Sequence, residues 1–129
     1  MEEERIFSIA EANSLIPQLE EMLLEIKKER KLLAKVESDV KKASDQARQD
    51  GGTRYGPRYI RAMEHIARNI EKIHEMGVVV KDLEKGLCDF PYLLDGRMVY
   101  LCWKLGESEI RWWHETHTGY SDRQPLQFS

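Results

Sequence analysis

The sequence predicts an α+β fold, in which a long antiparallel helical hairpin is followed by a small antiparallel β-meander. Apolar residues recur at spacings of three and four up to residue 76, which is the period of an amphipathic helix. From residue 78 the pattern changes to short β-branched and aromatic runs separated by turn residues. With 129 residues the chain has the length of one domain, so we expect residues 1–129 to form a single unit.

The first helix is predicted over residues 8–50. Ser8 and Glu11 fit a capping box, in which each side chain accepts the backbone N–H of the other residue. Pro17 removes one backbone donor, so we expect a kink or a restart near Ser14. The apolar residues that follow form a seam for packing against another helix. This seam consists of Leu15, Leu19, Met22, Ile26, Leu33, Val36, Val40, Ala43 and Ala47.

The second helix is predicted over residues 57–76, because Gly51-Gly52 suits the end of the first helix and Pro57 suits a first turn. Its apolar residues continue the seam, namely Ile60, Met63, Ala67 and Ile70, with Ile66 and Ile73 beside them. A short connection makes the two helices antiparallel. At roughly 1.5 Å per residue, the first helix is about 30 Å longer than the second. Its unmatched half must be covered by the tail or by a second chain, so a homodimer is predicted.

The tail, residues 78–126, is predicted to be rich in strands. Asp95-Gly96 suits a two-residue turn in which both residues have positive φ. The register set by this turn places Asp89 opposite Cys102. The core face of the hairpin then carries the apolar residues Phe90, Tyr92, Val99, Leu101 and Trp103.

A third strand is predicted over residues 110–115, and the loop before it decides which face His114 occupies. Because side chains alternate along a strand, a four-residue loop places His114 on the core face with Trp103. A five-residue loop instead places His114 opposite Cys102, with Asp89 next along the row. We favour the four-residue loop, because it buries the apolar side chains of this segment together.

Acid, thiol and imidazole groups in the tail indicate a candidate metal site. The candidate ligands are Asp89, Cys102, Glu107, His114 and His117, a mixed set that suits Zn²⁺ or Fe²⁺. The two histidines are three residues apart, so they converge only if the chain turns after Glu115. Two alternatives remain. The imidazoles could bond to carboxylates and close the end of the sheet around an inert buried thiol, or Cys102 could be a nucleophile with His114 as its base.

Four further residues of the tail are candidates for binding a ligand. They are Arg97, Trp103, Trp113 and Arg123. The planar guanidinium groups could hold a carboxylate or a phosphate, and the indole rings could stack on a ligand. The alternatives are ion pairs with nearby acids and packing in the core.

The charge pattern argues against a nucleic-acid partner. The formal charge is −3, and 20 basic and 23 acidic residues are mixed along the same helices, whereas nucleic acid needs a concentrated basic face. No apolar run approaches the roughly 18 residues that span a bilayer, and the start of the chain lacks the features of a signal peptide. We therefore expect no membrane partner and a cytoplasmic location, where Cys88 and Cys102 stay reduced.

Five segments occur in the order found in a known family: FSIAEANSLIPQL, VKDLEKGLCDFP, DGR, LCWKLGE and WHETHTGYSDRQPL. Through them the chain resembles a bacterial family described as domain of unknown function 2203. The resemblance covers almost the whole chain and implies helices followed by strands, without an activity, substrate or cofactor. Carried onto this sequence, its motif positions are Gly86, Asp89, Phe90, Pro91, Gly96, Arg97, Cys102, Trp103, Gly106, Glu107, Trp113, His114, Gly119 and Arg123. The family usually has valine at the position of Cys88.

Two functions from different classes are compatible with these observations. The first is a helical interaction or assembly module, a homodimer with a rigid β tail. The second is a small metal- or anion-binding protein, hydrolases included, with its site on the tail.

Overall fold

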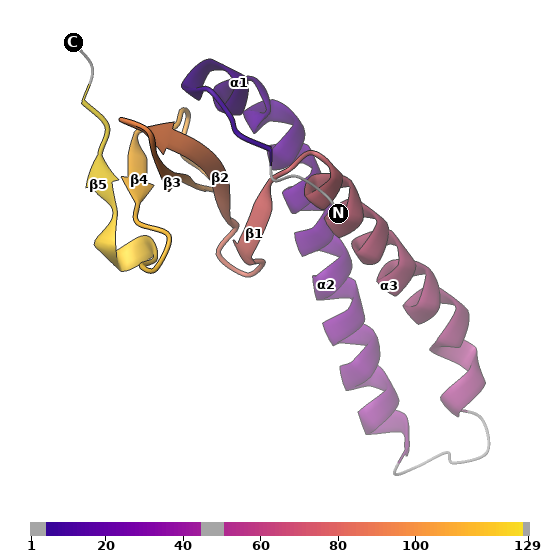
Figure 1. Cartoon of the computed structure of the whole chain (residues 1–129). Coiled ribbons are helices and arrows are strands. Elements are labelled where there is room, and N and C mark those ends of the chain that lie inside the picture. Colours follow the sequence, from indigo (N-terminus) through magenta and orange to yellow (C-terminus); the bar gives the residue numbers. More distant parts are fainter. Residues whose placement is uncertain (1–4, 45–50, 128–129) are drawn as a thin grey trace.

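The computed structural model describes residues 5–44 and 51–127, where three helices precede a five-stranded antiparallel sheet (Figure 1). The helices are α1 (Ile9–Ser14), α2 (Ile16–Ser44) and α3 (Gly51–Glu75). The strands are β1 (Val79–Asp82), β2 (Leu87–Leu94), β3 (Arg97–Lys104), β4 (Trp112–His114) and β5 (Gln124–Pro125), and a 3₁₀ turn, η1 (Tyr120–Asp122), precedes β5. The strands pair in chain order. The predicted α+β class is confirmed.

The chain enters its helices through the predicted capping box. The Ser8 hydroxyl accepts the Glu11 N–H, and the Glu11 carboxylate accepts the Ser8 N–H, both at 3.0 Å. The Leu15 N–H then donates to Ala12 O at 3.1 Å and closes α1. Pro17 falls in the first turn of α2, where its missing N–H removes no intrahelical bond. The predicted restart near Ser14 is confirmed.

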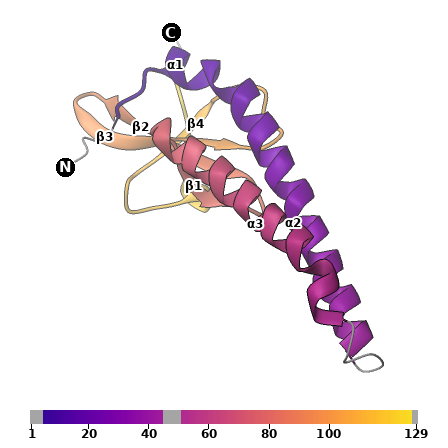
Figure 2. The ribbon, with the colours of Figure 1, turned by 90° about the vertical axis from the view of Figure 1, so that its right-hand side faces the viewer.

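The helices α2 and α3 run side by side as a hairpin (Figure 2). The prediction that α3 begins at Pro57 is wrong: α3 begins at Gly51, and Pro57 lies inside it. Gly51-Gly52 therefore belong to the first turn of α3 instead of ending the first helix. Ala47 of the predicted seam lies outside the described residues.

The face of α3 that is buried agrees with the prediction only in part, because Ile66, Ile70 and Ile73 pack in the core and other predicted positions do not. Ala62 and Asn69 are buried, and the Asn69 amide donates to the Glu25 carboxylate at 3.2 Å. Ile60 and Met63, which were expected to continue the seam, are 56% and 50% exposed. A small residue, Ala62, and a side-chain hydrogen bond from Asn69 occupy the contact with α2, so α3 is rotated and leaves part of its apolar stripe uncovered.

The first half of α2 is covered by the sheet, and its far half projects away from it (Figure 1). Leu19 and Met22 belong to one core cluster with Phe90, Leu101 and Trp103. The Phe7 ring meets the Phe90 ring edge-on, with centroids 5.3 Å apart. The predicted mismatch in length is wrong, because α2 has 29 residues and α3 has 25, and the sheet covers the start of α2. The argument from helix length for a homodimer therefore no longer applies.

The central hairpin has the predicted register, with Asp89 opposite Cys102. Asp95 and Gly96 both have positive φ, at 53° and 81°, as the predicted turn requires. Among the described residues, no helix is both long and apolar enough to cross a bilayer.

The favoured four-residue loop before β4 is wrong. Tyr100 pairs with His114 and Cys102 pairs with Trp112, so His114 lies on the face of Cys102. The reason is Ile110, which leaves the sheet and enters the core with 1% exposure, while its N–H donates to the Asn13 side chain at 2.7 Å. The five-residue alternative placed His114 on the correct face, but it paired His114 with Cys102, whereas the partner is Tyr100, two residues away.

Candidate metal centre

Three neighbouring strands bring a carboxylate, a thiol and an imidazole together on the sheet face that points away from the helices. Asp89 on β2 pairs with Cys102 on β3, and His114 on β4 pairs with the next same-face residue of β3, Tyr100. One ligand atom from each of Asp89, Cys102 and His114 lies within 4.8 Å of the other two. The three residues are 1%, 1% and 2% exposed, so we call them the buried triad.

A cavity of about 120 Å³ adjoins the buried triad. The segment after β4 covers it: the Thr118 N–H and hydroxyl both donate to Glu115 O at 3.1 Å, and this turn brings Thr118, Gly119 and Tyr120 to the cavity wall. Lys81 of β1 also lines it and is itself exposed. The space is larger than a single water needs. The triad therefore borders a partly enclosed space that can hold a small ligand.

The His114 ring is fixed at both nitrogens. Its Nδ1 lies 2.7 Å from Glu115 O, and because a carbonyl oxygen only accepts, Nδ1 carries the hydrogen. Its Nε2 lies 2.9 Å from Asp89 Oδ2, and a contact this short between two possible acceptors requires one shared proton. His114 Nε2 thus points toward the other two members of the triad. Metal-binding histidines adopt this orientation when a carbonyl holds the other ring nitrogen.

Burial sets the protonation of the other two members. It raises the pKa of the Asp89 carboxyl, while the hydrogen bond from His114 and the charge of Lys81 lower it. Burial, with the neighbouring Asp89 charge, raises the pKa of Cys102 to about 12, although Arg123 acts in the opposite direction. Near neutral pH the Cys102 thiol stays protonated, which does not support a cysteine nucleophile. Metal binding is the chemistry that removes such a proton.

An ion pair beside the triad holds the cover in place. Arg123 Nη1 donates to both carboxylate oxygens of Glu107, at 3.1 and 3.0 Å. Glu107 Oε1 also accepts the Lys104 N–H at 2.7 Å. The guanidinium lies over the rings of Tyr120 and Trp112, 4.2 and 4.9 Å from their centroids. Glu107 is therefore occupied, and Arg123 anchors Tyr120 above the cavity.

The remaining predicted site residues lie elsewhere. His117 is exposed, and neither His117 nor the half-buried Glu107 belongs to the triad. Trp103 is fully buried in the core, and its Nε1 donates to Glu107 O at 2.9 Å. Arg97 pairs with the Glu115 carboxylate at 2.8 Å and lies 5.9 Å from the centroid of the Trp113 ring. The structure thus brings together three of the five metal candidates, and it does not gather the four ligand-binding candidates in one cavity.

Lys81 and Tyr120 are among the cavity residues that were not predicted as site residues from the sequence. Lys81 follows the run Val78-Val79-Val80, which indicated a strand but gave it no partner. The pairing of Val79 with Asp89 places β1 beside the site. No sequence signal marks Tyr120, because its position depends on how the segment after β4 folds back.

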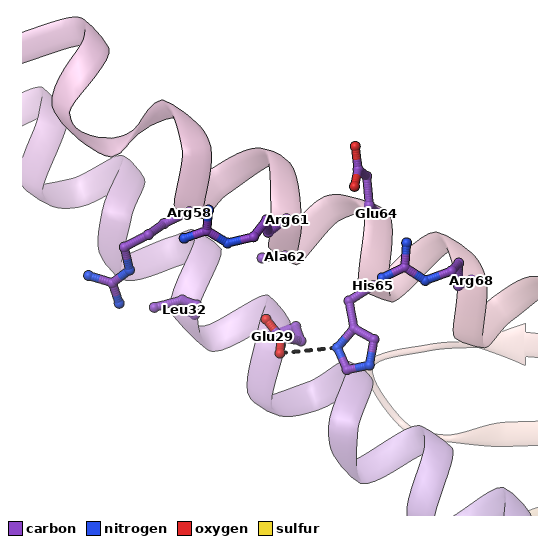
Figure 3. Close-up of a pocket in the computed structure, with 8 residues that line it drawn as sticks. All are labelled: Glu29, Leu32, Arg58, Arg61, Ala62, Glu64, His65 and Arg68. Atoms are coloured by element: carbon purple, nitrogen blue, oxygen red, sulfur yellow. Dashed lines mark hydrogen bonds and ion pairs between the residues drawn. The ribbon is translucent and has the colours of Figure 1, made fainter.

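A second hollow, of about 470 Å³, lies along the helical hairpin (Figure 3). Its lining consists of Arg58, Arg61, Ala62, Glu64, His65 and Arg68 from α3 and Glu29 and Leu32 from α2. His65 Nδ1 lies 3.2 Å from Glu29 Oε1, and charges of both signs line the hollow (Figure 3). It lacks the buried, converging polar groups of the sheet cavity, which is therefore the better candidate.

The family is decided by a match over most of the chain. A family model described as an uncharacterised conserved protein, DUF2203, matches residues 5–126. The chain belongs to this family. Comparison with curated proteins gave no match, and neither did comparison with solved structures. The DUF2203 match spans the three helices and all five strands, so it includes the buried triad and the cavity.

Five of the fourteen motif positions noted in the sequence form the site and the ion pair beside it. Asp89, Cys102 and His114 form the buried triad, and Glu107 and Arg123 form the ion pair that anchors the cover. These five positions come from three strands and two separate connecting segments of the chain. Their convergence makes the sheet cavity the candidate functional site.

Proposed function

We propose that this protein binds a divalent transition metal ion, Zn²⁺ or Fe²⁺, through Asp89 Oδ, Cys102 Sγ and His114 Nε2. The observation that carries the proposal is the buried triad itself, three ligand atoms within 4.8 Å of one another. Three protein ligands beside a small cavity match a metal site that keeps one coordination position open. We place it in the cytoplasm, where a reducing environment keeps Cys102 a free thiol.

The alternative is a purely structural hydrogen-bond network. Burying a carboxylate, an imidazole and a thiol together costs desolvation, and such groups contribute less stability than apolar residues of the same volume. The cavity beside them also leaves part of that volume unpacked. A bound dication offsets the cost of burying these groups, because one carboxylate and one thiolate neutralise its two charges. The mixed N, O and S ligand set favours Zn²⁺.

Elemental analysis of the untagged protein, followed by Zn²⁺ titration, tests the proposal. We expect one ion per chain and higher thermal stability. Cys102→Ala should abolish the binding. Cys88→Ala is the matched control, because Cys88 is equally buried on β2 but contributes to the core on the helix side. A metal-free protein that gains no stability from Zn²⁺, Mn²⁺ or Fe²⁺ would remove the metal site.

We also propose that the hairpin is an interaction module that self-associates through α3. Ile60, Met63 and Ala67 are exposed and follow the three–four spacing of a helix–helix seam, while α2 covers the neighbouring stripe. Such a stripe can pack on its own copy in a two-fold dimer. Light scattering after size exclusion tests this at two concentrations. Met63→Lys should prevent association, whereas Leu24→Lys, at a 54% exposed position on α2, should not. A strict monomer at both concentrations contradicts the dimer.

A further inference from the structure

We infer that the metal-loaded centre binds a small monoanion of carboxylate type between the metal ion and Lys81. This inference rests on the proposed metal site and names the ligand class of that site. It starts from the cavity lining, where Lys81 is the one charged side chain outside the buried triad. The Lys81 ammonium lies 5.3 Å from the centroid of the Tyr100 ring. No ion pair joins it to an acid anywhere in residues 5–44 and 51–127.

The charges of the loaded site favour an anion. The Asp89 carboxylate and the Cys102 thiolate together neutralise a dication. Arg123, the other cation close to the thiol, is already paired with Glu107 at 3.0 Å. Lys81 then remains as one uncompensated positive charge at the cavity wall. A monoanion restores neutrality, and a partly enclosed site strengthens that attraction relative to bulk water.

The size and shape of the cavity select among anions. The cavity volume of about 120 Å³ is several times the ~10–15 Å³ that one water needs, so the cavity accommodates a small anion such as acetate or bicarbonate. The two oxygens of such an anion can reach different partners, one at the open metal position and one at the ammonium. Thr118 and Tyr120 close the space on the side of the cover. A bulky acid does not fit unless the cover moves.

Cobalt-substituted protein tests this inference, because Co²⁺ bound to a thiolate gives a charge-transfer band and visible bands that respond to a new ligand. We expect acetate to shift the visible bands with saturation, and benzoate to have no effect. Lys81→Met should weaken acetate binding about tenfold, as expected for the loss of one partly screened charge. Lys85→Met is the matched control, because Lys85 is exposed on the turn that follows β1 and does not line the cavity.

The outcomes separate this inference from the proposal on which it rests. If no thiolate band forms, or if it persists in Cys102→Ala, the metal site itself is wrong. If the band forms normally but acetate leaves the visible bands unchanged, the anion site is wrong. Equal acetate binding by the wild type and Lys81→Met removes the role of Lys81. Benzoate binding as tight as that of acetate overturns the size argument.

Discussion

Zinc binding at the buried triad should release two protons near neutral pH. The Nδ1 hydrogen of His114 stays in place, because it is donated to Glu115 O at 2.7 Å. The proton shared between His114 Nε2 and Asp89 Oδ2 must leave, because the metal takes its position. The thiol proton of Cys102, whose pKa burial raises to about 12, must also leave.

The pH dependence of the zinc binding constant follows from this proton count. Each proton released makes the binding constant rise tenfold per pH unit, so two protons give about a hundredfold, or about 2.7 kcal/mol per pH unit. The sign is set by the direction of release: affinity increases as pH rises. The thiol contributes its tenfold at every pH below about 12. The shared proton contributes the other tenfold wherever the Asp89–His114 pair still holds it.

Calorimetric titration with Zn²⁺ in buffers of different ionisation enthalpy measures the proton count directly. A chelator competition repeated at several pH values gives the slope of the binding constant independently. In Cys102→Ala, any residual binding should release one proton fewer. A wild-type protein that releases no proton, or no more protons than Cys102→Ala, would refute the assignment of Cys102 as a ligand, whatever the affinity.

Three further substitutions test the surrounding structure by thermal denaturation. Ser8→Ala removes the capping box and should lower stability by about 1 kcal/mol, and an unchanged melting temperature would show that the cap contributes nothing. Glu107→Gln weakens the ion pair with Arg123 and should cost about 1–2 kcal/mol while metal uptake persists; loss of uptake would instead make Glu107 part of the site. His114→Ala leaves Asp89 without its partner and should cost roughly 1–3 kcal/mol in the metal-free protein. An unchanged melting temperature in His114→Ala would contradict the stabilising role of the His114–Asp89 contact.

Local signals in the sequence were sufficient for the elements that depend on neighbouring residues. The Ser8 capping box, the restart at Pro17 and the turn at Asp95-Gly96 each involve two to four consecutive residues, and all three are confirmed. The register of β2 with β3 followed from that turn alone. Pairing Asp89 with Cys102, two of the three triad members, was therefore predictable.

The predictions that were wrong concern features that depend on contacts between distant segments of the chain. The face of β4 was wrong because Ile110 leaves the strand to bond with Asn13, nearly a hundred residues earlier in the chain. The predicted face of α3 was wrong at Ile60 and Met63, whereas Ile66, Ile70 and Ile73 of the same stripe are packed in the core. Both sets of residues are compatible with a helical period. Periodicity indicates that the helix has an apolar stripe, whereas the rotation of the helix about its own axis depends on the element against which it packs.

The burial of the site also has a physical origin that the strand pattern does not contain. In a meander with helices on one face, polar residues of the opposite face normally meet water. Here the segment after β4 returns across that face, and the Glu107–Arg123 pair fixes it there. Arg97 holds the Glu115 carboxylate, and the Glu115 carbonyl orients His114. The same segment therefore covers the cavity and aims the imidazole into it, so a ligand that displaces the cover must also alter the geometry of the proposed centre.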